Sequence, residues 1–147
     1  NFKVKIILIG EEKDRVYGDN IKGVVPEVIN SCGLFNIGEL KSLISHSSLF
    51  VSVDTGPIYI AEAFDIPTVD IIGPMDENEQ PPRSNKNILI IPKREKSQLH
   101  IMNARVYDKD EALRQIQSIT VDEVYTAVVN LFKHGIIRPN NNFIYEK

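Results

Sequence analysis

The sequence is poor in cysteine and lacks long apolar runs: its 147 residues contain one cysteine, Cys32, and no tryptophan. A lone thiol excludes an internal disulfide and a cysteine zinc site, and it suits a reducing compartment. We expect Cys32 to pack as a small apolar side chain. No apolar run approaches the ~18 residues of a membrane-spanning helix, and no signal peptide is recognisable.

An excess of basic residues is also lacking, because 17 Lys and Arg are set against 20 Asp and Glu, for a formal net charge of -3. A nucleic-acid partner is therefore not expected. The three histidines do not have the spacing of metal ligands, so a metal site is not expected, and no cofactor is assigned. The hydrophobic fraction of 42% is that of a globular domain. Because Asn1 is not Met and leads almost directly into a strand, we expect the amino end to lie inside a longer polypeptide.

Short apolar segments alternate with helical patterns along the chain. Strands are predicted at 2–9, 28–31, 49–53, 68–72 and 87–91. Helices are predicted at 36–47, 57–64, 110–117 and 120–134, with polar or irregular segments at 75–86 and 92–109. A helix within 16–25 is expected to be short or broken because this segment contains Gly18 and Gly23. The alternation predicts an α/β fold with a parallel sheet covered by helices on both faces.

Two of the predicted helices begin with a capping box, in which the first residue and the residue three positions later bond each other's backbone amides. Asn36 and Glu39 form one such pair, and Thr120 and Glu123 form the other. Gly135 is placed to end the last helix.

The segment 49–73 carries the clearest candidate site. Asp54 follows a predicted strand, and in open α/β sheets ligands bind where the strands end. The Thr55 and Gly56 amides would lie at the start of a helix, where free N–H groups favour an anion, and Gly56 lets a phosphate approach closely. The alternative is that Asp54 and Thr55 only cap the helix.

Three motifs in this region resemble a known family. They are Val-Ser-Val-Asp-Thr-Gly-Pro-Ile-Tyr-Ile-Ala-Glu-Ala at 51–63, Ile-Pro-Thr-Val at 66–69 and Gly-Pro-Met-Asp at 73–76. Together they are similar to the signature of glycosyltransferase family 9, the ADP-heptose:lipopolysaccharide heptosyltransferases and their relatives. The resemblance extends over roughly 5–132.

The resemblance implies a GT-B enzyme, with two Rossmann-like domains facing each other across a cleft. This chain matches the carboxyl-terminal domain, which binds the nucleotide-sugar donor, with ADP-heptose as the suggested donor. The donor-binding domain would span 1–135 and a tail 136–147. The domain would hold the donor while a hexosyl or heptosyl group passes to a lipopolysaccharide or other glycan acceptor.

The general base would lie on the absent amino-terminal, acceptor-binding domain of the same polypeptide. No catalytic residue is therefore assigned in this chain, and we expect it to be inactive alone. The location implied is cytoplasmic, or peripheral at the inner face of the membrane.

By the same match, Asp54, Thr55 and Gly56 would contact the diphosphate and sugar of the donor. Tyr59 stands where the family usually has His; a tyrosine donates a hydrogen bond but does not become cationic. The family's cysteine cluster is absent from 96–109.

The resemblance assigns the nucleoside of the donor to other residues of this chain. Phe35 and Asn36 correspond to the place of the adenine, and Glu12 or Asp14 to the partner of the ribose. For each acid, a solvated loop charge is the commoner explanation.

Two other functions compete with this hypothesis. One is a non-catalytic nucleotide-sugar-binding or regulatory module with the same fold, which Tyr59 favours. The other is a phosphoacceptor receiver domain, which the helix beginning directly after Asp54 disfavours. Four basic residues could neutralise a diphosphate from nearby loops, although solvated charges are the commoner explanation: Arg83, Lys86, Lys93 and Arg94.

Overall fold

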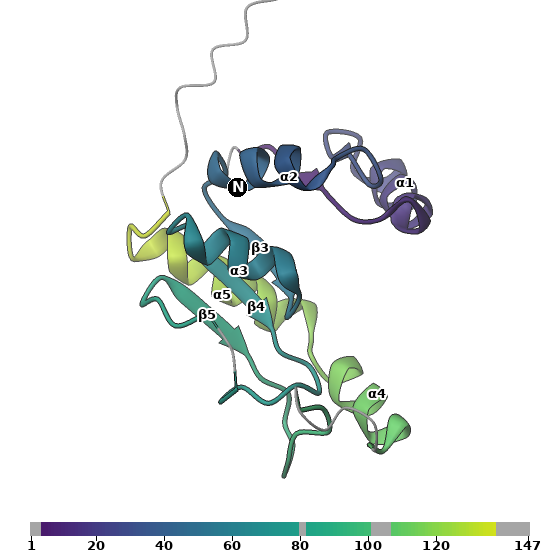
Figure 1. Ribbon diagram of the computed structural model, residues 1–147, viewed down its shortest axis with the longest axis vertical. Helices are drawn as coiled ribbons and strands as arrows, with labels where there is room; N and C mark the ends of the chain where they lie inside the picture. Colours follow the sequence, from purple (N-terminus) through teal and green to yellow (C-terminus); the bar gives the residue numbers. More distant parts are fainter. Residues whose placement is uncertain (1–3, 80–81, 101–106, 138–147) are drawn as a thin grey trace, which may run out of the picture. The chain divides into compact units, whose positions relative to one another are not determined.

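The computed structural model describes residues 4–79, 82–100 and 107–137 (Figure 1). The described chain divides into two compact units, residues 4–43 and residues 44–137. Each unit combines parallel strands with helices, which confirms the predicted α/β class. The strands form two parallel sheets, one in each unit, where the sequence predicts a single sheet. No helix in these ranges has the length and apolar character needed to cross a bilayer.

The first unit is built on two short parallel strands. β1 (Ile7–Leu8) pairs with β2 (Ile29–Asn30), and the 3-10 helix η1 (Glu12–Asp14) and helix α1 (Arg15–Val24) connect them. The strand predicted at 2–9 is thus shorter than expected within its described part. Cys32 is buried, as predicted, and this burial raises the pKa of its thiol.

The prediction that two glycines would shorten or break α1 is wrong, because the helix runs unbroken for 10 residues. Gly18 is buried against the side chain of Asn30, and a Cβ at this position would lie 2.3 Å from Asn30 Oδ1. Asn30 Nδ2 donates to the Arg15 carbonyl oxygen at 3.0 Å. The glycine therefore allows α1 to approach β2 closely rather than ending the helix.

Helix α2 (Ile37–Ser45) begins with the predicted capping box. Asn36 Oδ1 accepts from the amides of Gly38 at 2.9 Å and Glu39 at 3.0 Å. The Glu39 carboxylate accepts from the Asn36 amide at 2.9 Å in return. The cap is thus formed as the spacing predicts.

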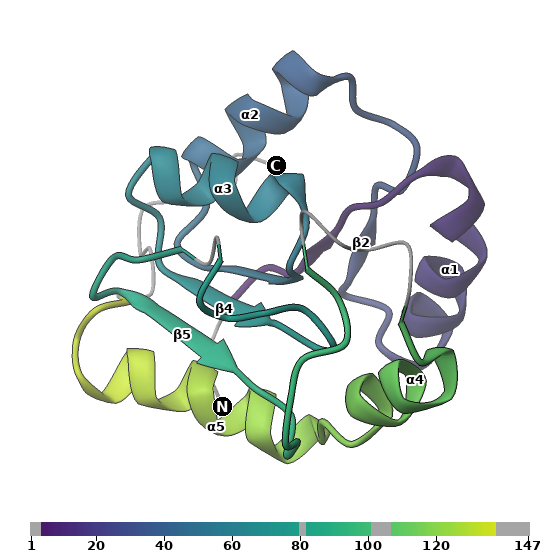
Figure 2. The ribbon, with the colours of Figure 1, turned by 60° about the horizontal axis from the view of Figure 1, so that its bottom comes forward.

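The second unit contains three parallel strands in the order β3-β4-β5: β3 (Phe50–Val53), β4 (Thr68–Ile71) and β5 (Asn87–Ile90). Helix α3 (Gly56–Ala63) contacts β3 and β4, and helix α5 (Val121–Lys133) contacts β4 and β5. Figure 2 shows these two helices on opposite faces of the sheet. Helices therefore cover both faces here, as predicted. The remaining helix is α4 (Lys109–Gln117).

The apolar core of this unit lies between the sheet and α5. Its fully buried centre consists of Val69, Ala127, Leu131 and Ile137. Helix α5 begins with the predicted capping box, in which Thr120 Oγ1 accepts from the Glu123 amide at 3.2 Å. Ile137 joins the core two residues beyond Gly135, whose φ of 69° ends the helix.

Candidate functional site

The turn between β3 and α3, residues Asp54, Thr55 and Gly56, is called the α3 turn below. The Asp54 amide donates to the Ile71 carbonyl oxygen at 3.2 Å, which fixes the turn to the end of β4. Thr55 is the N-cap of α3 and has an extended backbone, yet its side chain makes no capping hydrogen bond. Its hydroxyl instead donates back to the Val53 carbonyl oxygen at 3.2 Å.

The α3 turn leaves backbone donors free. Within the described part of the chain, the amides of Thr55 and Gly56 have no hydrogen-bond partner, and both residues are exposed. A Cβ built on Gly56 would meet no atom within 4 Å. Free amides at a helix start, beside open space, form an arrangement that accepts anions.

Tyr59 reaches back from α3 to the turn. Its hydroxyl donates to Asp54 Oδ1 at 2.7 Å. Burial first, and then this bond to Asp54, raise the pKa of Tyr59, so the phenol stays a neutral donor. The alternative in which Asp54 and Thr55 cap the helix is wrong, because neither side chain accepts from an α3 amide.

A carboxyl group that the sequence reasoning missed lies behind the α3 turn. Asp70 is 0% exposed on the face of β4 that α3 covers, and both of its oxygens lack a partner in the described residues. Burial, and then the charge of Asp54, raise the pKa of Asp70 to about 7. The available signal was a carboxylate inside a strand of a parallel sheet, where side chains on both faces are usually buried.

The acids proposed for the ribose lie together in the first unit, just after β1. Glu12 pairs with Arg15 Nε at 3.1 Å, and Asp14 Oδ2 accepts from the Glu11 amide at 2.9 Å. The Gly33 amide donates to the Gly10 carbonyl oxygen at 2.9 Å, so the loops after β1 and β2 meet here. Glu12 is nevertheless a mostly solvated charge, with its side chain 73% exposed, and Asp14 is partly buried.

The pair proposed for the adenine follows the loop after β2. Phe35 is 39% exposed, and Asn36 uses its side-chain oxygen to cap α2. The structure therefore brings Asp54, Thr55, Gly56 and Tyr59 together in the second unit, while Glu12, Asp14, Phe35 and Asn36 belong to the first.

Two of the four basic loop residues, Arg94 and Lys86, have side-chain partners in the described structure. Arg94 was expected to be a solvated charge, and that expectation is wrong: its side chain is 5% exposed. The guanidinium donates to the carbonyl oxygens of Gly73 at 2.7 Å and Met75 at 2.6 Å and pairs with Glu77. Lys86 pairs with Asp65.

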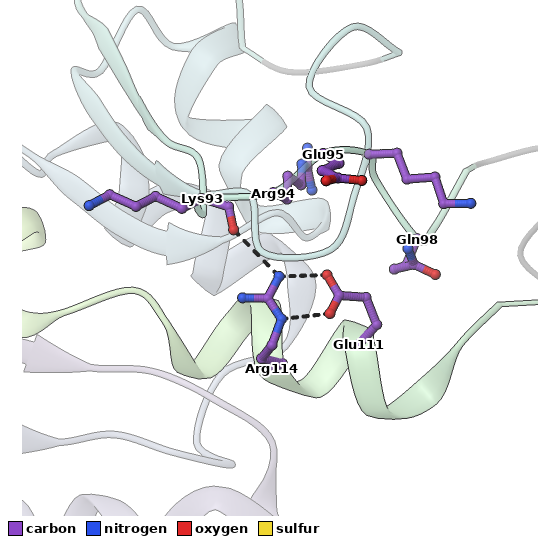
Figure 3. A pocket seen from close by; sticks show the side chains of 7 residues that line it. Lys93, Arg94, Glu95, Gln98, Glu111 and Arg114 are labelled. Atoms are coloured by element: carbon purple, nitrogen blue, oxygen red, sulfur yellow. Dashed lines mark hydrogen bonds and ion pairs between the residues drawn. The ribbon is translucent and has the colours of Figure 1, made fainter.

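A pocket of about 520 Å³ lies beside Arg94 (Figure 3). Across it, Arg114 bonds Glu111 through Nε and Nη2, each at 2.6 Å. The Arg114 and Gln115 side chains lower the pKa of Glu111 to about 2. Two of the basic side chains that line this pocket are already paired with acids, Arg114 with Glu111 and Arg94 with Glu77. Its lining consists of Lys93, Arg94, Glu95, Lys96, Gln98, Glu111 and Arg114.

Parallel strands with helices on both faces define an open α/β fold, in which ligands bind where the strands end, as at the start of α3. The sequence of residues 1–106 matches the model of glycosyltransferase family 9 (heptosyltransferase). The chain belongs to this family.

Known proteins of the family resemble the chain over part of their length. Lipooligosaccharide heptosyltransferase 2 of Haemophilus influenzae is 31% identical over 90 residues, which are 58% of this chain and 26% of the relative. The structure of E. coli ADP-heptose LPS heptosyltransferase II matches with a TM-score of 0.68 at 21% identity, over 90% of this chain and 37% of that one.

A family 9 glycosyl transferase from Veillonella parvula matches with a TM-score of 0.61 at 19% identity, over 88% of this chain and 37% of that one. At this identity the two solved structures support the fold alone. The chain spans little more than a third of these structures and about a quarter of the Haemophilus relative.

Proposed function

We propose that this chain is the donor-binding part of a glycosyltransferase that passes a sugar from a nucleoside-diphosphate sugar to a lipopolysaccharide or other glycan acceptor. The observation that carries the proposal is the α3 turn, with two free amides, open space beside Gly56 and a carboxylate held by Tyr59. Family membership supplies the reaction class. The relative from E. coli is named for ADP-heptose, which makes ADP-heptose the first donor to test.

In this proposal the chemistry is displacement of the nucleoside diphosphate by an acceptor hydroxyl, with inversion at the sugar carbon. The Thr55 and Gly56 amides would stabilise the negative charge that develops on the leaving diphosphate. Fixed amide dipoles do this without reorganising during the reaction. Asp54, oriented by Tyr59, would accept from sugar hydroxyls of the donor.

The rest of the site would come from the acceptor-binding, amino-terminal domain of the same polypeptide. Coverage of 37% of the solved relatives supports a longer protein. Glu12 or Asp14 would bind the ribose, and Phe35 and Asn36 would lie at the adenine. The donor-binding domain would span 1–135 with the tail 136–147, in the cytoplasm or at the inner face of the membrane.

A non-catalytic nucleotide-sugar-binding module is the second candidate function. The Tyr59 hydroxyl supports it, because this donor is engaged with Asp54 and its raised pKa keeps it uncharged. Such a module would bind the donor without transferring the sugar.

The affinity of the chain for ADP, UDP and GDP tests the proposal in three proteins: the parent, Gly56→Ala and Gly23→Ala. Both substitutions add one methyl group to a helix where a Cβ meets nothing within 4 Å, so Gly23→Ala is a matched control. We expect Gly56→Ala to weaken binding by about tenfold or more, because the methyl group occupies the path of the phosphate. Equal affinities for all three proteins would place the site elsewhere.

Donor turnover separates the two candidate functions. We expect no useful transfer by the chain alone, because one wall of a cleft does not bring donor, acceptor and base together. Transfer should appear when the amino-terminal domain is added in trans. No transfer with both parts present would support the binding module. Robust transfer by the chain alone would contradict the proposal and direct the search for a base to Asp14, Asp54 and Asp76.

A further inference from the structure

The face of the second sheet beneath α3 contains polar atoms that are buried without partners. In the described part of the chain these are Thr68 Oγ1, both oxygens of Asp70, and the side-chain oxygen and nitrogen of Asn87. Thr68 is paired with Asn87 in the sheet register, and Asp70 is two residues further along the same face. Such atoms are rare in folded proteins, because an unpartnered buried polar group destabilises the folded state.

Asp70 is the one group of this set whose charge can change. Helix α3 packs above it with Ile58 and Ala61 fully buried, an apolar environment that disfavours an ionised carboxylate. Burial accordingly raises its pKa to about 7, whereas carboxylates with hydrogen-bond donors, such as Asp76, have a lowered pKa.

The charges around Asp70 are also unfavourable to its ionisation. Asp54 in the α3 turn acts on it directly, and the titratable residues of α3 are Tyr59, which lies close enough to feel the charge of Asp70, and Glu62. The residues paired with it on β3 and β5 are Ser52 and Leu89, neither of which titrates near neutral pH. The groups that these elements bring near Asp70 are therefore negative or neutral, and none of them favours its ionisation.

The position of Asp70 connects it to the α3 turn. The Asp54 amide is bonded to the carbonyl oxygen of Ile71, the residue that follows Asp70. A negative charge on Asp70 would thus lie directly behind Asp54 and next to the turn that carries the free amides. An anion at those amides and a charge on Asp70 would repel each other through a medium of low dielectric constant.

We propose that Asp70 is a positioning residue that must hold a proton for the α3 turn to bind an anionic diphosphate, so that ionisation of Asp70 weakens the site. This inference rests on the proposed function of the α3 turn. The reverse effect follows from linkage: a bound diphosphate favours the protonated form of Asp70 by the same factor.

The test measures the affinity of the chain for ADP-glucose by calorimetry between about pH 6 and about pH 8.5. Each phosphorus of this probe carries one ester oxygen and the shared anhydride oxygen, which leaves it one strongly acidic group, so the probe itself does not titrate in this range. We expect the parent to lose about tenfold in affinity, and Asp70→Asn to lose less than about twofold. Asp65→Asn is the matched control: it removes an exposed carboxylate at a left-handed position that Asn tolerates, and it should follow the parent.

A second measurement needs no variant. The carboxyl carbon of Asp70, followed by NMR, should titrate with a midpoint near 7 in the free chain. Saturating ADP-glucose should raise this midpoint by about one pH unit. By linkage, this shift corresponds to the tenfold change in affinity between the protonated and ionised forms of Asp70. A purely structural role of Asp70 would leave the midpoint unmoved by ligand.

The outcomes separate this inference from the proposed function. Binding of ADP-glucose with equal pH dependence in the parent and Asp70→Asn overturns the inference and leaves the donor site standing. A titration midpoint of Asp70 that does not change when ADP-glucose binds likewise overturns the inference and leaves the donor site standing. No binding of ADP-glucose at any pH by the folded chain overturns both.

Discussion

The two faces of the three-stranded sheet are built differently. On one face, α5 begins with a complete capping box and covers Val69 in an apolar core. On the other, α3 begins at Thr55 without a capping side chain and covers Asp70, whose carboxyl oxygens have no partner in the described residues. The α5 face satisfies its polar groups and buries apolar surface, which stabilises the fold. The α3 face leaves donors and a carboxyl group unsatisfied, as expected of a site that binds a ligand.

The largest effect that would test this difference is the dependence of stability on pH. The pKa of Asp70 is about 7 when folded and 3.8 ordinarily, so between these values the folded chain holds a proton that the unfolded chain has released. The protonation of Asp70 therefore contributes fully to the free energy of unfolding below about pH 4. This contribution decreases by about 1.4 kcal/mol per pH unit toward pH 7, about 4 kcal/mol in all.

Urea unfolding of the parent and of Asp70→Asn between about pH 4 and about pH 8 measures this dependence. The parent should lose stability through the window, and the variant should lack that component. Glu111 does not interfere, because its lowered pKa of about 2 adds stability only as the pH rises to its ordinary value of 4.5. Parallel pH profiles for the two proteins would contradict the assignment.

Shortening a side chain on the α5 face gives the next effect. Leu131 is 2% exposed in the core cluster, so Leu131→Ala should lower the free energy of unfolding by about 3 kcal/mol. Nucleotide affinity, measured where the variant is folded, should not change, because the α3 turn keeps its geometry. An unchanged free energy of unfolding in Leu131→Ala would show that packing on the α5 face does not stabilise the fold.

The starts of the two helices can be compared directly with one substitution each. Thr120→Ala removes a side-chain cap and should cost about 1 kcal/mol. Thr55→Ala removes only exposed hydroxyl bonds, to the Val53 carbonyl oxygen and to Ser52 Oγ, and should cost less than about 0.5 kcal/mol. Thermal unfolding of both variants decides the matter; equal losses would mean that Thr55 caps α3 in solution.

A comparably small effect on stability is expected at Tyr59. Tyr59→Phe leaves the ring in place and removes the donor to Asp54, so stability should fall by about 1 kcal/mol or less. Donor affinity should fall if Tyr59 orients Asp54 for the sugar. Unchanged affinity would show that the hydroxyl serves the fold alone.

Local sequence patterns predicted much of this fold. The capping boxes at Asn36 and Thr120 formed as expected, because their hydrogen bonds depend on residues three positions apart. Helix α1 was misjudged because a glycine reads as a breaker, whereas the approach of Asn30 that Gly18 allows is a contact between distant segments. The boundaries of four of the five predicted strands agreed to within one residue, with β1 the exception.

The site was predicted less completely than the fold. The α3 turn follows from its motif, because a strand, a short turn and a helix start are local features. The burial of Asp70 and of Arg94 depends on what packs above each side chain, and a charged residue in a sequence is ordinarily read as exposed. These two corrections thus required tertiary structure.

The measurement that tests the central claim most directly is an NMR titration of the chain with ADP, UDP and GDP. It follows the backbone amides at the two helix starts of the second unit. The account predicts saturable shifts at Thr55 and Gly56 and none at Val121 and Asp122, whose helix is capped by Thr120. Shifts that spare Thr55 and Gly56 while clustering elsewhere would contradict it.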